Sequence, residues 1–150
     1  IVPAKGVQIY ECRARKDKSG HEWVFMAPEA DLYDTKGNLI GRHGAGPHWE
    51  AIDGSRVKAV VKSRADAPEA GNIPWLLLAA TQDGPEAGLF SKTTSIQRVN
   101  TVGGVAPANS CAGSNVGQQA RVHYRADYYF FSAATPVAKA FDGPARFSAL

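Results

Sequence analysis

The sequence predicts an all-β fold, an antiparallel β-sandwich or closed barrel of about seven to nine strands with little helix. Short runs rich in β-branched and aromatic residues recur along the chain, and turn residues separate them, including 15 glycines and 9 prolines. Helical periodicity is almost absent. The chain has 150 residues, of which 44% are hydrophobic and 21% charged, so it is long enough to build one hydrophobic core.

The first half of the chain predicts two strands and a hairpin. Residues 7–12, "VQIYEC", are rich in β-branched and aromatic side chains, and residues 22–27, "EWVFMA", are apolar on both faces, as in a central strand. Residues 32–40 read as a hairpin whose turn lies at 34–38, "DTKGN".

Three further strands are expected in the second half, together with a segment of alternating polarity. In residues 55–63 Val57, Ala59 and Val61 alternate with basic residues, so one face is expected to be wet. Residues 75–78, "WLLL", predict a buried core strand, and the long Thr/Ser-rich segment 88–101 predicts a strand that bends or bulges. The clearest strand is 120–133, with one face formed by Val122, Tyr124, Ala126, Tyr128 and Phe130.

We expect residues 1–133 to form a single β domain and residues 134–150 to form a C-terminal tail. A short helix is possible at 135–141, where Thr135 could cap and Pro136 could occupy the first helical position. The longest apolar run, 73–80, is far shorter than the roughly 20 residues that span a bilayer, so no transmembrane segment is expected. A start without Met is typical of a trimmed or mature chain.

Charge and motifs exclude several function classes. The net charge is only +3, and the densest basic patch, residues 13–18, has no aromatic stacking platform beside it, so we interpret it as a solvated hairpin end and expect no nucleic-acid partner. The chain has no P-loop, dinucleotide fingerprint, C-x-x-C pair or G-x-S-x-G elbow. No cofactor is predicted.

The stretch "GRHGAGPHWEAIDGS", residues 41–55, gathers most of the candidate site residues. His43 and His48 are separated by "GAGP", which excludes helical zinc geometry, but a loop could bring both to one metal ion with His123 or Glu50 as a third ligand. The alternative is that turn backbone groups satisfy these histidines.

Trp49, Glu50 and Asp53 complete the candidates of this stretch. An exposed Trp49 beside polar groups would suit a sugar or another small molecule, whereas a buried one would plug the end of the fold. Glu50 and Asp53 are possible acid–base groups.

Arg98 is the candidate that lies outside the stretch. It shares a face with Ile96 in an unbulged strand and so would be drawn inward. A buried arginine needs a carboxylate partner, for which Asp127 or Glu50 could serve, or else it anchors a ligand.

The two cysteines, Cys12 and Cys111, could form a disulfide or remain two buried thiols, and their spacing alone does not decide between these alternatives.

Several motifs together resemble a domain-of-unknown-function family of exported bacterial and fungal proteins, some of them lipoproteins. They are W-x-F-x-A-P-E-A-x-L at 23–32, G-x-H-x-x-G-P-x-W-E-x-x-D-G-S-x-V at 41–57, IPWLLL at 73–78 and IQRVNTVGGVAP at 96–107. The resemblance carries over both cysteine positions. It therefore implies a Cys12–Cys111 disulfide and an exported location: periplasmic, lipid-anchored at the outer membrane or secreted.

We therefore expect an exported, non-catalytic domain that binds a small molecule, a glycan or a surface through residues 43–53. The alternatives are a hydrolase-like or metal-dependent enzyme that uses the same loop, and a purely structural or interaction module. If His43 and His48 point into one open cleft with Glu50 or Arg98, a binding or catalytic site is favoured. If their side chains bond backbone carbonyls and Trp49 is buried, the structural or interaction module is favoured.

Overall fold

The computed structural model describes residues 1–133, and within them eight antiparallel strands form one continuous sheet. The helix considered at 135–141 lies outside the described residues. In the described part of the chain no helix is long and apolar enough to span a membrane. The strands are β1 (Val2–Ala14), β2 (His21–Tyr33), β3 (Leu39–Gly44), β4 (His48–Ala51), β5 (Arg56–Ala65), β6 (Trp75–Gln82), β7 (Thr93–Gly103) and β8 (Gln119–Ser132).

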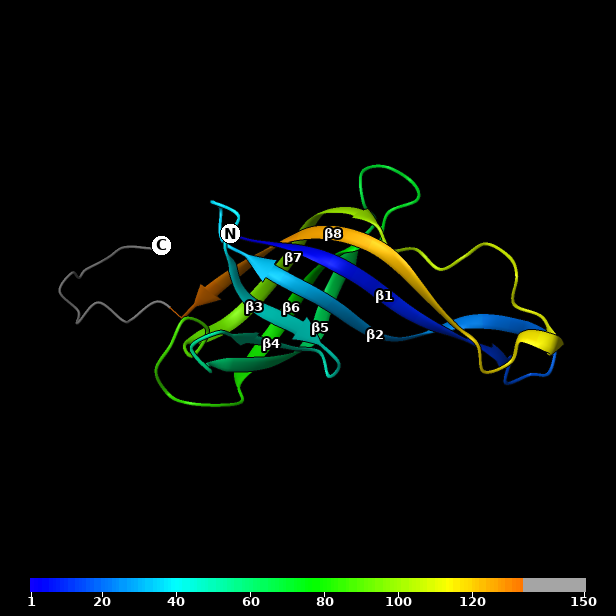
Figure 1. Cartoon of the computed structure of the whole chain (residues 1–150), viewed down its shortest axis with the longest axis horizontal. Helices are drawn as coiled ribbons and strands as arrows, with labels where there is room; N and C mark the ends of the chain where they lie inside the picture. Colours follow the sequence, from blue (N-terminus) through cyan, green and yellow to red (C-terminus); the bar gives the residue numbers. More distant parts are fainter. Residues whose placement is uncertain (134–150) are drawn as a thin grey trace.

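The sheet is a closed barrel, which confirms the predicted all-β class and selects the barrel over the sandwich. Each strand pairs with the next along the chain, and β8 returns to pair with β1, so that Val2 lies opposite Tyr128. Closure removes both sheet edges. Figure 1 shows β1 and β8 side by side across the molecule.

The β1–β2 hairpin and the start of β8 extend beyond the barrel, as the right side of Figure 1 shows. The extension also holds the 3₁₀ turn η1 (Gly113–Asn115). Cys12 forms a disulfide with Cys111, as expected from the resemblance. The backbone N–H of Cys12 donates to the carbonyl of Gln118, and the Gly117 N–H donates to the Cys12 carbonyl. The segment before β8 is thus fastened to β1.

The two ends of the barrel differ. Because the strands alternate in direction, the connections 34–38, 52–55 and 83–92 share one end, and 45–47, 66–74 and 104–118 share the other. Phe90 closes the first end, where its ring stacks on Phe130 with centroids 4.4 Å apart. We call the first the closed end and the second the open end.

Several strand assignments differ from the sequence-based expectation. Strand β4 was hidden between two turns, and the expected strand at 88–101 begins only at Thr93, after a turn that carries Phe90. Its predicted bulges are confirmed, because the β7–β8 register shifts twice. The "WLLL" run is not buried on both sides: Leu77 is 40% exposed, because a barrel wall has one face toward solvent.

Candidate functional site

A cavity of about 540 Å³ lies inside the barrel at its open end. All eight strands contribute to its lining, as expected only of the interior of a closed barrel. Its volume falls in the range of small-molecule sites, about 300–1,000 Å³. Most of the lining is apolar, from Phe25, Met26, Pro28, Pro47, Val61, Ile73, Pro74, Leu76 and Leu78.

Phe25 and Met26 form an apolar rim at the mouth. A β-bulge in the β1–β2 ladder pairs Ile9 with Ala27 and Tyr10 with Phe25, which leaves Met26 unmatched. Such bulges re-aim side chains. The two rim side chains are 50% and 40% exposed, respectively, although both also line the cavity. The expectation that 22–27 forms a central strand buried on both faces is therefore wrong.

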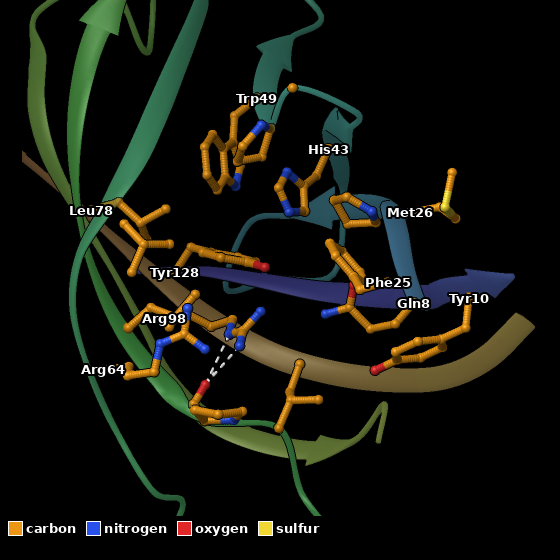
Figure 2. A pocket seen from close by; sticks show the side chains of 17 residues that line it. Gln8, Tyr10, Phe25, Met26, His43, Trp49, Arg64, Leu78, Arg98 and Tyr128 are labelled. Carbon is orange, nitrogen blue, oxygen red and sulfur yellow. Dashed lines mark hydrogen bonds between the residues drawn. The ribbon is translucent and has the colours of Figure 1, made fainter. Parts of the chain in front are cut away.

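Among residues 1–133, two arginines and no carboxylate line the cavity. Arg98 on β7 is half-buried, and its Nε and Nη2 donate to the backbone carbonyl of Pro74, at 3.1 and 2.8 Å. Arg64 on β5 is more exposed. Within residues 1–133 neither arginine has an acidic side chain at ion-pair distance. Figure 2 shows both below Tyr128 in that view, opposite Trp49.

The connection that carries Pro74 is itself held in place. The Thr101 hydroxyl donates to the Ile73 carbonyl at 2.6 Å, and the Gly103 N–H donates to the Asn72 side chain at 2.8 Å. Arg98 therefore bonds a fixed carbonyl, which sets the position of its guanidinium in the cavity wall.

Two deeply buried polar atoms of the lining have no hydrogen-bond partner among the described residues. They are Oε1 of Gln8, a side chain 2% exposed, and Nε1 of Trp49, a side chain 1% exposed. Buried polar atoms are normally paired, because leaving one unpaired costs about 1–3 kcal/mol. The third such atom, Trp75 Nε1, belongs to a residue outside the cavity lining.

His43 is neutral in this environment. Its Nδ1 lies 2.8 Å from the His48 carbonyl oxygen, which can only accept, so Nδ1 carries the proton. Burial, more than the nearby positive charge of Arg98, lowers the pKa of His43 to about 3. The imidazole stacks on Trp49, with centroids 4.3 Å apart and planes at 15°.

The tyrosines of the interior are neutral as well. Burial raises the pKa values of Tyr10 and Tyr128, while the positive charge of Arg98 opposes the rise. The Tyr128 hydroxyl lies 3.1 Å from the Tyr124 hydroxyl, and the Tyr10 hydroxyl donates to the Gly104 carbonyl. Arg98 and Arg64 are thus the charged groups of the cavity lining.

The structure separates the residues expected to form one site. His43, Trp49 and Arg98 all line the cavity, whereas His48, Glu50 and Asp53 do not. His48 bonds the Ala45 carbonyl within its own turn, through Nδ1 at 2.7 Å. Residues 43 and 48 lie on the paired strands β3 and β4 rather than in one loop.

Trp49 is buried, and so it offers no exposed face for stacking on a sugar. His43 and His48 both bond backbone carbonyls, so their hydrogen bonds stabilise the β3–β4 hairpin. The side chains of His43 and Trp49 nevertheless face the cavity (Figure 2). Successive side chains of β3 and β4 point to opposite faces of the sheet, so part of the stretch lines the cavity and part lies on the outer wall.

Asp53 stands at the closed end, where it fastens the turn that carries Phe90. Its carboxylate accepts the N–H and hydroxyl of Ser55 and the N–H of Leu89. These hydrogen bonds lower the Asp53 pKa. The Ser55 hydroxyl oxygen also accepts the Phe90 N–H at 3.0 Å. Asp53 and Ser55 therefore hold Phe90, the side chain that closes this end of the barrel.

The expected ion-pair partners of Arg98 are wrong. Glu50 points to the outer wall and pairs with Arg56 at 3.2 Å. Asp127 instead accepts a hydrogen bond from the Asn100 side chain. The inward direction predicted from the shared face with Ile96 is consistent with Arg98 lining the cavity, but a carbonyl takes the place of the carboxylate.

The three histidines considered as metal ligands are not brought together. His123 is exposed on the outer side of β8 and does not line the cavity of His43. Among residues 1–133 no group of three or more His, Cys, Asp and Glu side chains is placed to hold a metal ion.

The sequence reasoning missed Gln8 and Tyr128 as cavity residues. The inward face of β1 reads Ala4, Gly6, Gln8, Tyr10 and Cys12, so Gln8 is its one amide among small, aromatic and sulfur-bearing residues. A polar side chain in the middle of an apolar face was the available signal. Tyr128 lies on the inner face of β8, which was predicted correctly, but the pattern indicated only a core residue and not a cavity residue.

One comparison with known proteins found a match. A family model described as a protein of unknown function (DUF3455) matches residues 1–132, which is nearly all of the described chain. No curated protein and no solved structure matches the chain.

Proposed function

The chain belongs to the DUF3455 family of proteins of unknown function, and we propose that it is a non-catalytic binding protein that holds a small, largely apolar molecule inside its barrel. The observation that carries this proposal is the cavity, which is open at one end, apolar over most of its lining, and provided with buried polar atoms that lack partners. Eight-stranded barrels have an interior of the size that holds one small ligand.

The two ends of the barrel suit this role. Phe90, fastened by Asp53 and Ser55, closes one end with apolar packing. At the other end the exposed rim of Phe25 and Met26 offers an apolar path into the cavity. A molecule that enters would bury its surface without disturbing the strand ladder.

Binding is favoured over catalysis by the chemistry of the lining. The described part of the chain places no carboxylate in the cavity lining, and a His43 whose pKa is about 3 is a weak proton acceptor at neutral pH. The remaining polar groups are suited to orienting a ligand.

Export is the second part of the proposal. Disulfides persist in oxidising compartments and are rare in the cytosol, so the Cys12–Cys111 bridge supports a periplasmic, lipid-anchored or secreted location. Fractionation of the source cells with an antibody against the domain would test it. A purely cytosolic pool with two alkylatable thiols would contradict it.

Titration with N-phenylnaphthylamine, a neutral apolar dye that fluoresces when it leaves water, tests binding. We expect saturable one-site binding to the wild-type protein. The variant Leu76→Trp fills the cavity and should weaken binding by about tenfold or more, since a well-packed apolar site loses contact area and room together.

Leu77→Trp is the matched control, because the neighbouring residue on the same strand is 40% exposed and absent from the lining. This variant should bind like the wild type. Equal dye binding by Leu76→Trp and Leu77→Trp, or no saturable binding at all, would refute the proposal.

A further inference from the structure

We propose that the ligand of the cavity carries one anionic head group, a carboxylate, sulfonate or phosphate, which Arg98 binds inside the barrel while the apolar body fills the remaining space. This inference rests on the proposed function, since it names the chemistry of the molecule that the same cavity holds.

Arg98 is the first observation. It occupies an inward position on β7, where an apolar side chain would avoid the cost of removing a charge from water. Its two hydrogen bonds go to one neutral carbonyl, through Nε and Nη2. The Tyr128 hydroxyl also interacts with the guanidinium, which partly offsets the rise that burial causes in the Tyr128 pKa, but among the described residues no carboxylate pairs with Arg98. An arginine fork matches the geometry of an anionic head group.

The charge of the cavity is the second observation. Arg64 adds a second positive charge to the lining, no carboxylate of residues 1–133 compensates either arginine, and His43 and the tyrosines are neutral. A low-dielectric wall strengthens the attraction between Arg98 and an entering anion. The cavity thus favours one negative charge over a neutral or cationic group of the same size.

The unpartnered atoms are the third observation. Within residues 1–133, Trp49 Nε1 is a buried donor without an acceptor, and the Gln8 amide carries a buried Oε1 without a donor. In Figure 2 the Gln8 amide and the Arg98 guanidinium point toward the middle of the cavity. A polar ligand group that reaches the Gln8 amide pairs it, whereas a pure hydrocarbon leaves it unpaired. The Gln8 amide on β1 and the Arg98 guanidinium on β7 therefore point toward the space that the ligand would fill.

A matched pair of dyes tests the inference. Anilinonaphthalene sulfonate differs from N-phenylnaphthylamine essentially by one sulfonate group. We expect the wild-type protein to bind the sulfonate at least about tenfold more tightly, the gain typical of a hydrogen bond to a charged group. Displacement of the neutral dye by decanoate, decyl phosphate and decanol identifies the head group. One of the two anions should displace it at least about tenfold better than decanol.

Arg98→Met should reduce the anion preference, measured as the ratio of the affinities of the two dyes for the same variant, to less than about threefold. Arg125→Met removes an exposed arginine from the outside of β8 and is the matched control. It should retain the full preference. If Arg98→Met does not fold, judged by circular dichroism, Arg98→Lys keeps the charge but lacks the fork. Arg98→Lys should also lower the ratio of the two dye affinities, measured on the folded variant.

The outcomes separate the two proposals. If the wild type binds both dyes equally, and Leu76→Trp still blocks the neutral one, the cavity binds ligands but the anionic head group is refuted. The same holds if a folded Arg98 variant keeps the whole preference. If neither dye binds with saturation, the proposed function itself fails.

Discussion

His43 and Trp49 lie directly opposite each other on β3 and β4 and stack with their ring planes 15° apart. The Nδ1–H of His43 donates to the His48 carbonyl, so one short hairpin holds both rings against the cavity. The imidazole is therefore buried in its neutral form, and protonation works against the fold.

The free energy of unfolding should fall as the pH drops from about 6.5 toward 3. The pKa of His43 is about 3 in the folded protein and 6.5 ordinarily, so within this window the unfolded chain binds the extra proton. The loss is at most about 1.4 kcal/mol per pH unit. Urea unfolding of the wild type and of His43→Phe should show this component only in the wild type. His123→Gln, on the outer wall, should keep it. An identical pH dependence in all three proteins would contradict the assignment.

Loss of the disulfide should lower the free energy of unfolding by roughly 4–5 kcal/mol in the chain-entropy description, because the bridge closes a loop over a sequence separation of 99 residues. Cys12→Ala/Cys111→Ala, compared with the wild type in urea, measures this change. A reductant should destabilise the wild type and leave the double variant unaffected. Equal urea midpoints for the two proteins would exclude a stabilising role.

Ser55→Ala should destabilise the closed end by about 1–3 kcal/mol, since it leaves the buried Phe90 N–H without its acceptor. Hydrogen exchange should show faster exchange at Leu89 and Phe90 than in the wild type. Ser19→Ala, at the exposed tip of the β1–β2 hairpin, is the control and should change stability by less than about 0.5 kcal/mol. Unchanged exchange at Phe90 would contradict the role of Ser55 in holding the turn that carries Phe90.

Gly41→Ala should destabilise the barrel by about 1–3 kcal/mol or more, because a Cβ there would overlap the backbone carbonyl oxygen of Glu50 on the neighbouring strand. Gly113→Ala is the control, since its Cβ would meet only the His21 ring at an ordinary contact distance of 3.6 Å. Thermal unfolding of both variants checks the difference. A Gly41→Ala protein as stable as the wild type would show that β3 and β4 can separate at low cost.

Much of the barrel was predictable because a barrel wall has two distinct faces. Alternation along β8 correctly placed Tyr124, Ala126 and Tyr128 inside, and the shared face with Ile96 pointed Arg98 inward. The all-β class followed from the same patterns. Closure into a barrel was beyond local reasoning, because pairing between β1 and β8 joins segments more than a hundred residues apart.

The site was harder to predict, because its members are far apart in sequence. Residues 41–55 attracted attention by composition, yet Glu50 and Asp53 serve the outer wall and the closed end. Gln8 and Arg98 come from β1 and β7, and only the curvature of the sheet makes them face one space. The carbonyl of Pro74 as the partner of Arg98 could not be inferred from side-chain types at all.

The pairing of β1 with β8 also determines when the barrel can close during synthesis and folding. The first strand finds its last partner only after the chain has been made as far as Gln119–Ser132. Until then β1 and β7 are open edges that can pair with other chains. A product truncated before Gln119 should therefore assemble into aggregates, and a permuted chain that links the ends of β8 and β1 directly should close its ring sooner.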